Sequence, residues 1–500
     1  MRPNRIAIVG GGPAGAFAAA ELARGGRDVL LVDEKLAWEK PCGGGITPKA
    51  IQRWPFLGDA TAERNWTTHC ELTAPSGRNV TFPLNSQIAI FSRLALNGLM
   101  LERARDAGVQ VLRERIVNID GAPGNWMLSS SYSRHQSDFI VLAAGARNPF
   151  RGQFTRSLGP ENFVVAAGYY VPGTHRTVQI KFLPGLHGYI WIFPRADHFS
   201  VGICGRMQGK NTADLRRILE EQMPDFGLAL DGAQFYAHII PALTRESLRA
   251  IQFAGDGWAM IGDAAGLVDA ITGEGLYYAL RSAEIFAQTM NDGATETYAA
   301  LLKAEILPEL ELAAAIAERF YSGNWMGGAV LERMVSLTER SPSFRELMRD
   351  LFAGTQEYSN LKRRVRRSLP RIAAETLASV ILRSTRELGR PPAQRTAGRN
   401  QYMRSLLLVV LLLLLLTISH VSGATASIST KRHGFRHAYY LFLSGSPAAC
   451  EDCYIPLLIT TESIEEMTRK KRIWGFITSE GSLTEQLVRL AVQVAGQHQL

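Results

Sequence analysis

The feature that most constrains this chain is its N-terminal segment, Arg5-Ile-Ala-Ile-Val-Gly-Gly-Gly-Pro-Ala-Gly15. An apolar stretch typical of a strand ends at Gly10, and an alanine-rich helical pattern begins near Pro13. Gly10, Gly12 and Gly15 have the G-x-G-x-x-G spacing, in which the glycines make a tight turn, admit a pyrophosphate and let helix and strand pack closely. Pro13 fits the first helical turn, whose free N–H groups would face the phosphates.

A second strand, Asp28-Val-Leu-Leu-Val-Asp33, follows the turn at Gly25-Gly26 and ends in an acid. Asp33 stands about 20 residues beyond the glycines, where an acid contacts the ribose hydroxyls of a dinucleotide. A glycine motif alone also occurs in unrelated α/β turns. The complete strand–turn–helix–strand–acid unit predicts a Rossmann-like nucleotide-binding domain.

Composition limits the possible classes of protein. A chain of 500 residues, 46% hydrophobic and 20% charged, is long enough for two or more globular domains. Its five cysteines are too few for a disulfide scaffold. Much of the net charge of +9 lies between Lys362 and Arg472, around a leucine-rich segment, which favours a membrane as partner. No zinc-finger, basic-zipper or RNA-binding signature occurs, so we expect no nucleic-acid partner.

Further segments extend the α/β pattern. Residues 70–90 alternate as short strands, and Arg93 opens a helix that runs to Ala107. Residues 138–145 form an apolar run typical of a central parallel strand. The loop Pro41-Cys-Gly-Gly-Gly45 has almost no side-chain volume, so either a flat ligand lies on its backbone or it is a flexible surface turn.

Residues 164–205 have the pattern of an antiparallel sheet inserted into the nucleotide domain. In this stretch Tyr189, Trp191 and Phe193 alternate and project from one face of a strand. That face either binds substrate or packs into the core. A later strand delivers Gly262-Asp263 to its end, ahead of Gly273-Glu-Gly275 and a helix over residues 276–290.

The pattern of the C-terminal part predicts helices over residues 298–388, and these helices carry no catalytic signature. The basic stretch 362–390 is either a solvated helix face or a membrane contact. Residues 391–404 form a polar linker. The uncharged segment 405–426 contains a leucine run of the length of a signal-peptide core, and Ala424-Thr-Ala426 resembles a cleavage site. It is either a membrane anchor or the trace of two joined reading frames. The tail 427–500 contains the pair Cys450 and Cys453, which is as consistent with chance as with function.

Together these motifs resemble the geranylgeranyl reductase family of flavoproteins, whose FAD domain is of the glutathione-reductase type. The resemblance covers roughly Arg5 to Leu388, and Tyr189-Ile-Trp-Ile-Phe-Pro194 is its most specific part. The chain departs from the family pattern at Ala144-Gly145, where relatives often carry Asp-Gly, and at Ala270, where a proline is frequent.

The resemblance implies an FAD-dependent oxidoreductase that reduces isolated C=C bonds of a prenyl lipid. By this resemblance the catalytic residues would be Cys42, Tyr189 and Trp191. The prenyl chain would contact Gly43, Gly44, Gly45, Phe193 and Pro194. FAD would be held by Gly10, Gly12, Pro13, Ala14, Gly15, Asp33, Arg93, Gly145, Gly262, Asp263, Gly273 and Gly275. The external electron donor stays open between NADPH, ferredoxin and a deazaflavin, and no metal is expected.

The chemistry agrees with these residue types. An isolated alkene accepts hydride poorly, so reduction needs a proton as well, and aromatic faces would stabilise the transient positive charge. Cys42 would be protonated at neutral pH and is the candidate proton source; the alternative is a merely buried thiol. The competing functions are a flavin monooxygenase or halogenase on the same fold, and a membrane-tethered interaction protein that retains a relic flavin fold.

We therefore predict an α/β protein with an FAD-dependent reductase at 1–390. Its FAD-binding core is expected at about 1–50, 90–150 and 250–295, and its substrate sheet at about 55–90 and 151–250, followed by a helical region at 296–390. The hydrophobic segment and a small tail domain would follow. Because arginines precede the leucine run, the positive-inside rule places the flavin domain on the cytoplasmic face of a membrane and the tail outside.

Overall fold

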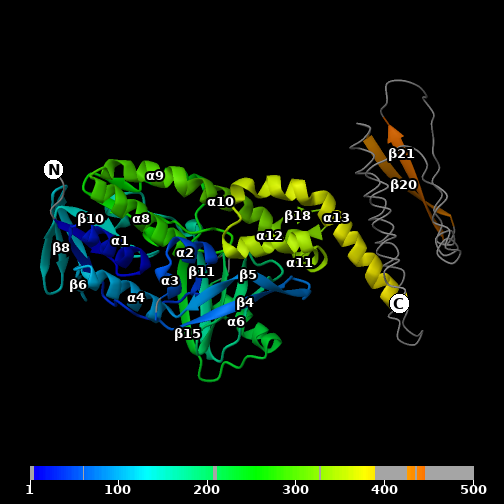
Figure 1. Cartoon of the computed structure of the whole chain (residues 1–500), viewed down its shortest axis with the longest axis horizontal. Coiled ribbons are helices and arrows are strands. Elements are labelled where there is room, and N and C mark those ends of the chain that lie inside the picture. Colours follow the sequence, from blue (N-terminus) through cyan, green and yellow to red (C-terminus); the bar gives the residue numbers. More distant parts are fainter. Residues whose placement is uncertain are drawn as a thin grey trace. The chain divides into compact units, whose positions relative to one another are not determined.

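The computed structural model describes residues 5–59, 61–206, 211–325, 328–388, 425–433 and 436–444. The chain divides into two compact units. The first comprises Met1–Glu339 and Phe344–Arg367, and the second comprises Arg340–Ser343 and Ser368–Leu500. The first unit contains the two large sheets and is described first (Figure 1).

The nucleotide-type sheet of the first unit has six strands in the order β16-β17-β10-β1-β2-β6. All neighbours are parallel except the edge pair β16 and β17. Its strands are β1 (Arg5–Val9), β2 (Asp28–Val32), β6 (Gln110–Leu112), β10 (Phe139–Leu142), β16 (Ala254–Gly255) and β17 (Trp258–Met260). The strand that was predicted to be central, β10, does lie between β1 and β17.

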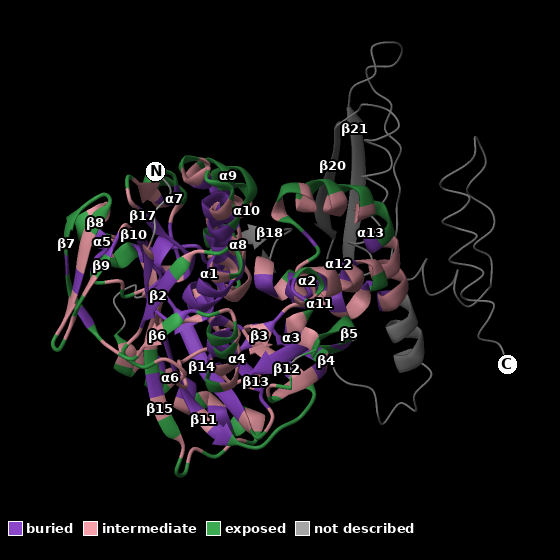
Figure 2. Cartoon of the chain, turned by 60° about the vertical axis from the view of Figure 1, so that its left-hand side comes forward, coloured by how far each residue is buried: buried purple, intermediate pink, exposed green. Residues whose placement is uncertain are grey.

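Three helices cover this sheet and share its core: α1 (Pro13–Arg24), α4 (Arg93–Asp106) and α8 (Leu276–Asp292). Helix α1 is buried along most of its length, as Figure 2 shows, because its alanines allow close packing on both neighbours. A Cβ on Gly15 would lie 1.9 Å from the carbonyl oxygen of Gly10, so only glycine fits there. The predicted strand–turn–helix–strand unit is thus confirmed.

The second sheet has eight strands in the order β15-β11-β14-β13-β12-β4-β5-β3. It is antiparallel except for the parallel pair β12 and β4. Its strands are β3 (Gly45–Ile46), β4 (Arg64–Thr73), β5 (Asn79–Phe91), β11 (Phe163–Pro172), β12 (Thr177–Lys181), β13 (Gly188–Pro194), β14 (His198–Gly205) and β15 (Gln234–Pro241). The strands predicted within 164–205 are confirmed. The strands predicted for 70–90 are confirmed, but they are not short: they belong to β4 and β5, which form one long hairpin.

A small three-stranded sheet was not predicted. It consists of β7 (Ile116–Ala122), β8 (Asn125–Ser130) and β9 (Arg134–Ser137). Short helices complete this part: α2 (Pro48–Arg53), α3 (Phe56–Asp59), α5 (Arg151–Phe154), α6 (Thr212–Gln222) and α7 (Arg245–Ala250), with 3₁₀ turns at η1 (Pro160–Asn162), η2 (Met223–Phe226), η3 (Gly262–Ala265) and η4 (Thr295–Thr297).

The predicted helical region is confirmed. It comprises α9 (Tyr298–Glu305), α10 (Leu307–Ser322), α11 (Val330–Arg340), α12 (Pro342–Ala353) and α13 (Tyr358–Leu388), with a short hairpin of β18 (Asn324–Trp325) and β19 (Gly328–Ala329). The second unit also contains an antiparallel hairpin of β20 (Thr425–His433) and β21 (Arg436–Ser444).

The described part of the chain has no helix that is both long enough and apolar enough to cross a membrane. The leucine run within 405–426, the linker 391–404 and the Cys450–Cys453 pair lie outside the described residues. Their roles as anchor, signal or exported tail therefore stay predictions.

Candidate active site

A large cavity of about 1330 Å³ opens between the two sheets of the first unit and helices α10 to α13. Small-molecule sites usually occupy roughly 300–1,000 Å³, so this volume can take a dinucleotide and a second ligand together. The carboxyl ends of β1, β2 and β10 meet at one end of the cavity, where open parallel sheets bind their ligands. Most of the predicted site residues line it: Gly10, Gly12, Pro13, Ala14, Asp33, Cys42, Gly43, Gly44, Gly45, Arg93, Gly145, Tyr189, Trp191, Phe193, Asp263, Gly273 and Gly275.

The N-terminus of α1 faces this cavity. Its N-cap is Gly12, no side chain caps it, and a Cβ on Gly12 would meet nothing within 4 Å. Gly10 has a φ of +115°, and a Cβ there would lie 2.4 Å from the carbonyl oxygen of Ala143. The turn therefore leaves free backbone donors and open space where a pyrophosphate would bind.

Asp33, at the end of β2, is held by the backbone around it. Its carboxylate accepts hydrogen bonds from the N–H groups of Gly11 at 2.7 Å, Lys35 at 2.7 Å and Leu36 at 2.6 Å. Oδ1 accepts from both Lys35 and Leu36, whereas Oδ2 accepts only from Gly11, so Oδ2 keeps a second lone pair for a ribose hydroxyl.

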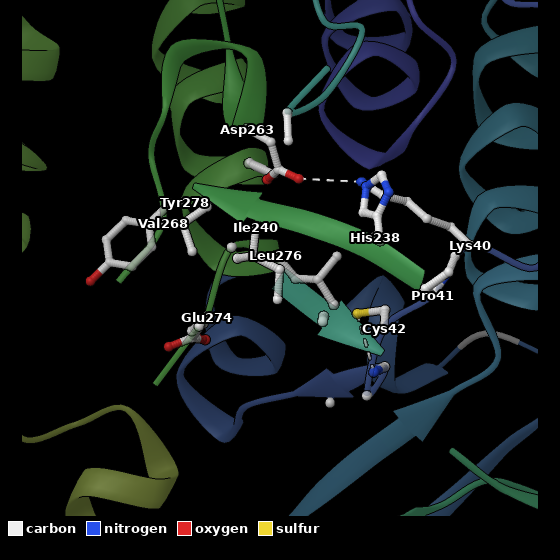
Figure 3. Close-up of a pocket in the computed structure, with 18 of the residues that line it drawn as sticks. Lys40, Pro41, Cys42, His238, Ile240, Asp263, Val268, Glu274, Leu276 and Tyr278 are labelled. Carbon is white, nitrogen blue, oxygen red and sulfur yellow. Dashed lines mark hydrogen bonds and ion pairs between the residues drawn. The ribbon is translucent and has the colours of Figure 1, made fainter. Parts of the chain in front are cut away.

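A charged group lies beyond the glycine turn. Lys40, which sequence reasoning missed, forms an ion pair of 3.3 Å with Asp263, and Figure 3 shows the two side chains facing each other. Burial acts to raise the pKa of Asp263, but the cations of Lys40 and Arg93 outweigh it and hold that pKa below its ordinary value. Asp263 is therefore anionic at neutral pH.

Arg93 itself is 4% exposed and donates to Asn97 Oδ1 at 3.3 Å. Its Nε has no partner among the described residues. A buried guanidinium N–H in a cavity wall fits an anionic or carbonyl-rich ligand, because an unsatisfied buried donor costs about 1–3 kcal/mol.

His238 on β15 was also missed. It lines the cavity beside Lys40, and its Nε2 has no partner in the described part of the chain. Burial, and secondarily the charge of Lys40, lower the pKa of His238 to about 3, so the imidazole is neutral. The consecutive residues 236–240 of β15 all line the cavity, so no period of two along this strand could have singled out His238.

The Cys42 loop packs against the aromatic strand. A Cβ on Gly43 would lie 2.6 Å from the ring of Phe193, and one on Gly45 would lie 3.2 Å from it. The volume that these glycines leave is therefore filled by the protein's own phenylalanine. Cys42 is half-buried, and its Sγ accepts a hydrogen bond from the N–H of Gly44 at 3.4 Å.

The aromatic strand β13 presents its three rings to the cavity, as their alternation predicted. Trp191 is only 5% exposed and its indole N–H donates to Ser200 Oγ at 3.4 Å. The hydroxyl of Tyr189 donates to the carbonyl of Thr272, which ties β13 to the loop that carries Gly273. Trp191 also packs with Ala166, Cys204 and Tyr236, so this face belongs both to a buried cluster and to the cavity.

Glu274 adds a titratable group that the sequence did not single out. It lines the cavity, and Thr47 Oγ1 donates to its Oε1 at 3.4 Å. Burial and the nearby Asp269 raise the pKa of Glu274 to about 7. This carboxyl is thus partly protonated at neutral pH and can carry a proton inside the cavity.

The far wall of the cavity is apolar and comes from the helices that showed no catalytic signature. Its side chains are contributed by α10 to α13 and include Ile316, Phe320, Met334, Met348, Leu351, Phe352 and Leu361. Three predicted residues do not line the cavity: Gly15 and Gly262, which allow close packing, and Pro194, which pairs with Phe199 in the sheet.

Comparisons with known proteins identify the relatives of this chain. A family model described as pyridine nucleotide-disulphide oxidoreductase matches residues 4–155. The chloroplastic geranylgeranyl diphosphate reductase of Arabidopsis thaliana is 26% identical over 324 residues, a match that covers 58% of this chain and 66% of that protein. The menaquinone reductase of Mycobacterium tuberculosis is 28% identical over 322 residues, covering 57% of this chain and 76% of that protein.

The chain is a homologue of the geranylgeranyl reductases. The resemblance seen in the motifs is thereby confirmed, and with it the assignment to the FAD-dependent oxidoreductases.

Solved structures show the same fold. A geranylgeranyl bacteriochlorophyll reductase-like protein from Thermoplasma acidophilum aligns with a TM-score of 0.62 at 18% identity, covering 72% of this chain and 98% of that one. The flavin-dependent brominase Bmp2 aligns with a TM-score of 0.58 at 16% identity, with the same coverage. At these identities the likeness shows the fold alone.

The residues present fit FAD. The uncapped α1 and the open face of Gly12 suit a pyrophosphate, Asp33 suits a ribose, and the orphaned Arg93 Nε supplies a buried donor.

Proposed function

We propose that this protein reduces isolated C=C bonds in the isoprenoid chain of a prenyl lipid with FAD as its cofactor. The observation that carries the proposal is one cavity with two kinds of lining. The uncapped α1, Asp33 and Arg93 suit a dinucleotide. The aromatic strand, Cys42 and the apolar helical wall suit a long apolar chain.

Reduced FAD, when bound, would supply the hydride. The chain's own residues would do the remaining work. The aromatic rings on β13 and the apolar wall would hold the prenyl chain and exclude water, and the ring faces would stabilise positive charge as it develops on the alkene. Cys42 would hold the proton for the second carbon, and Glu274, whose pKa is raised to about 7, would replenish that proton as a second titratable group of the same cavity wall.

Product mass decides between this function and its competitor. The enzyme is reduced with dithionite under anaerobic conditions, which avoids choosing among NADPH, ferredoxin and a deazaflavin, and is then given geranylgeranyl diphosphate. A reductase adds two hydrogens per double bond without oxygen. A monooxygenase or halogenase, which the shared fold permits, would turn over only with oxygen, and a binding protein would do neither.

We also propose that the first unit works at the cytoplasmic face of a membrane, where its substrate resides. The support is the exposed cluster Lys362, Arg363, Arg366 and Arg367 on α13, which suits an anionic lipid surface. Co-sedimentation with vesicles of anionic lipid tests this. Binding that is lost when the four residues are changed to glutamine supports it, and binding that is unchanged refutes it.

A further inference from the structure

Arg195 directly follows the aromatic–proline motif and is fully buried, with a relative exposure of 0%. Burying a guanidinium is costly unless its charge is paired and its N–H groups find acceptors. Arg195 does not line the cavity, so it touches neither proposed ligand. The role of Arg195 therefore depends on the segments of the chain that its side chain contacts.

The side chain of Arg195 joins two segments that lie far from it in sequence. Its Nη1 contacts Glu39 Oε1 at 2.5 Å, and its Nη2 donates to the carbonyl oxygen of Cys42 at 2.7 Å. The guanidinium also lies 5.0 Å from the centre of the Tyr170 ring. Arg195 therefore holds the Cys42 loop through a charge-assisted hydrogen bond to Glu39 and a second hydrogen bond to the Cys42 carbonyl.

Each partner of Arg195 is itself fixed. Glu39 accepts hydrogen bonds from the N–H groups of Arg93 at 3.0 Å and Leu94 at 3.2 Å, which open helix α4. His198 Nε2 lies 3.0 Å from Arg195 Nη1 and must accept, since arginine only donates. Its Nδ1 then carries the proton and donates to Asp197 Oδ1 at 2.6 Å.

A second donor reaches the same carbonyl. Ser200 Oγ donates to the carbonyl oxygen of Cys42 at 2.9 Å, and the same hydroxyl accepts from the indole N–H of Trp191. Cys42, Trp191 and the first turn of α4 are thus linked by one network whose centre is Arg195.

We propose that Arg195 is a positioning residue that fixes the Cys42 thiol relative to Trp191 and to the cofactor helix α4. The inference rests on the proposed function for its catalytic consequence, but the position of the thiol can be measured without any turnover. Loss of Arg195 frees the loop, so the thiol becomes more accessible and the proton is delivered from the wrong place.

The test compares Arg195→Met with wild type in the full-length protein. We expect the flavin content of the variant to stay unchanged. Its kcat should fall by on the order of 100-fold with a much smaller change in KM, because a reacting group is misplaced. Alkylation of Cys42 by iodoacetamide, followed by peptide mass mapping, should become several-fold faster, while the buried Cys70 and Cys204 stay protected. Arg195→Lys should recover part of both signals, because lysine can pair with Glu39 but cannot also bridge to the Cys42 carbonyl.

Arg216→Met is the control, because Arg216 also pairs with a carboxylate and lies against aromatic rings, but it is half-exposed and its hydrogen-bond partners are Tyr169 and Glu220 and not the Cys42 loop. Ser200→Ala removes the second donor to the Cys42 carbonyl and, with it, the acceptor of the Trp191 indole N–H. It leaves no buried charge unpaired, so it tests the proposal even if Arg195→Met does not fold. We expect it to speed Cys42 alkylation as well. Alkylation at the wild-type rate in Arg195→Lys and Ser200→Ala would overturn the proposal. Faster alkylation in a protein that never reduces an alkene would uphold the positioning role and refute the proposed reaction.

Discussion

The indole ring of Trp191 lies directly on the backbone of Gly202 in the neighbouring strand, where a Cβ would come within 2.2 Å of the ring. The two residues are register partners in the pairing of β13 with β14. The absence of a side chain at Gly202 therefore sets the position of Trp191 in the cavity wall.

Gly202→Ala should displace the indole and abolish most alkene reduction, while FAD stays bound. The overpacking should cost about 1–3 kcal/mol of folding stability. Product mass and the flavin absorbance of the purified variant measure the two effects. Gly205→Ala is the control, because its Cβ would come within 3.0 Å only of Leu186 Cδ1, the end of a side chain that can move. Equal activity in both variants would show that the position of Trp191 does not matter.

Trp191→Ala is expected to keep its flavin and to lose or redirect the reduction, because the ring lines the cavity and is assigned to the substrate, not to the cofactor. Removing a buried tryptophan should also cost about 3–5 kcal/mol of stability. Trp126→Ala, in the small sheet and outside the cavity, controls for the loss of an indole. If Trp191→Ala turns over normally, the aromatic strand serves only as core.

Arg93→Ala should weaken FAD retention, because it removes the buried guanidinium whose Nε points to no protein partner in the described residues. The flavin-to-protein absorbance ratio after gel filtration measures the loss, and flavin released by heat should have the mass of FAD. Arg105→Ala changes an exposed arginine of the same helix and should have no effect. Equal ratios in the two variants would remove Arg93 from the cofactor site.

Glu274 gives a pH dependence with a defined sign. Its pKa is raised in the folded protein to about 7 from an ordinary value of 4.5, so the native state binds this proton more tightly than the unfolded state does. Stability should then fall as the pH rises from about 4.5 through 7. Glu274→Gln removes this contribution, so the Tm of the variant should rise relative to the Tm of wild type as the pH increases through that window. A constant Tm difference between the two proteins across the window would contradict the raised pKa.

Sequence reasoning succeeded where the signal is local. The turn from Gly10 to Pro13, the acid at Asp33 and the alternation of Tyr189, Trp191 and Phe193 each follow from spacing along one segment. The structure also shows that the apolar positions of the predicted helices form a cavity wall. No local pattern could reveal this, because the sequence of an apolar helix face does not identify the surface or cavity that it faces.

The missed residues depend on contacts that are distant in sequence. Arg195 looks like any surface arginine, and only its pairing with Glu39, 156 residues away, explains its burial. Lys40 and His238 are also distant in sequence, and they lie beside each other in the cavity wall. The small sheet β7–β9 was missed because its buried positions do not recur with a period of two: a register shift lies between Ile116 and Asn118, and the buried residues Ile116 and Ile119 are three apart.

The last prediction concerns the minimal enzyme. Among the described residues, all those that line the cavity lie between Val9 and Leu361, and the described part of the chain after Leu361 supplies no wall of the candidate site. A chain truncated after Arg390 should therefore bind FAD and reduce the prenyl substrate as the full-length protein does when the substrate is dispersed in detergent. Flavin absorbance and anaerobic product mass measure both properties. A chain truncated after Ser341 is the contrasting control, because it lacks α12 and α13 and with them Met348, Phe352 and Leu361 of the apolar wall. An inactive truncation at Arg390 that still carries FAD would show that the C-terminal segment takes part in catalysis.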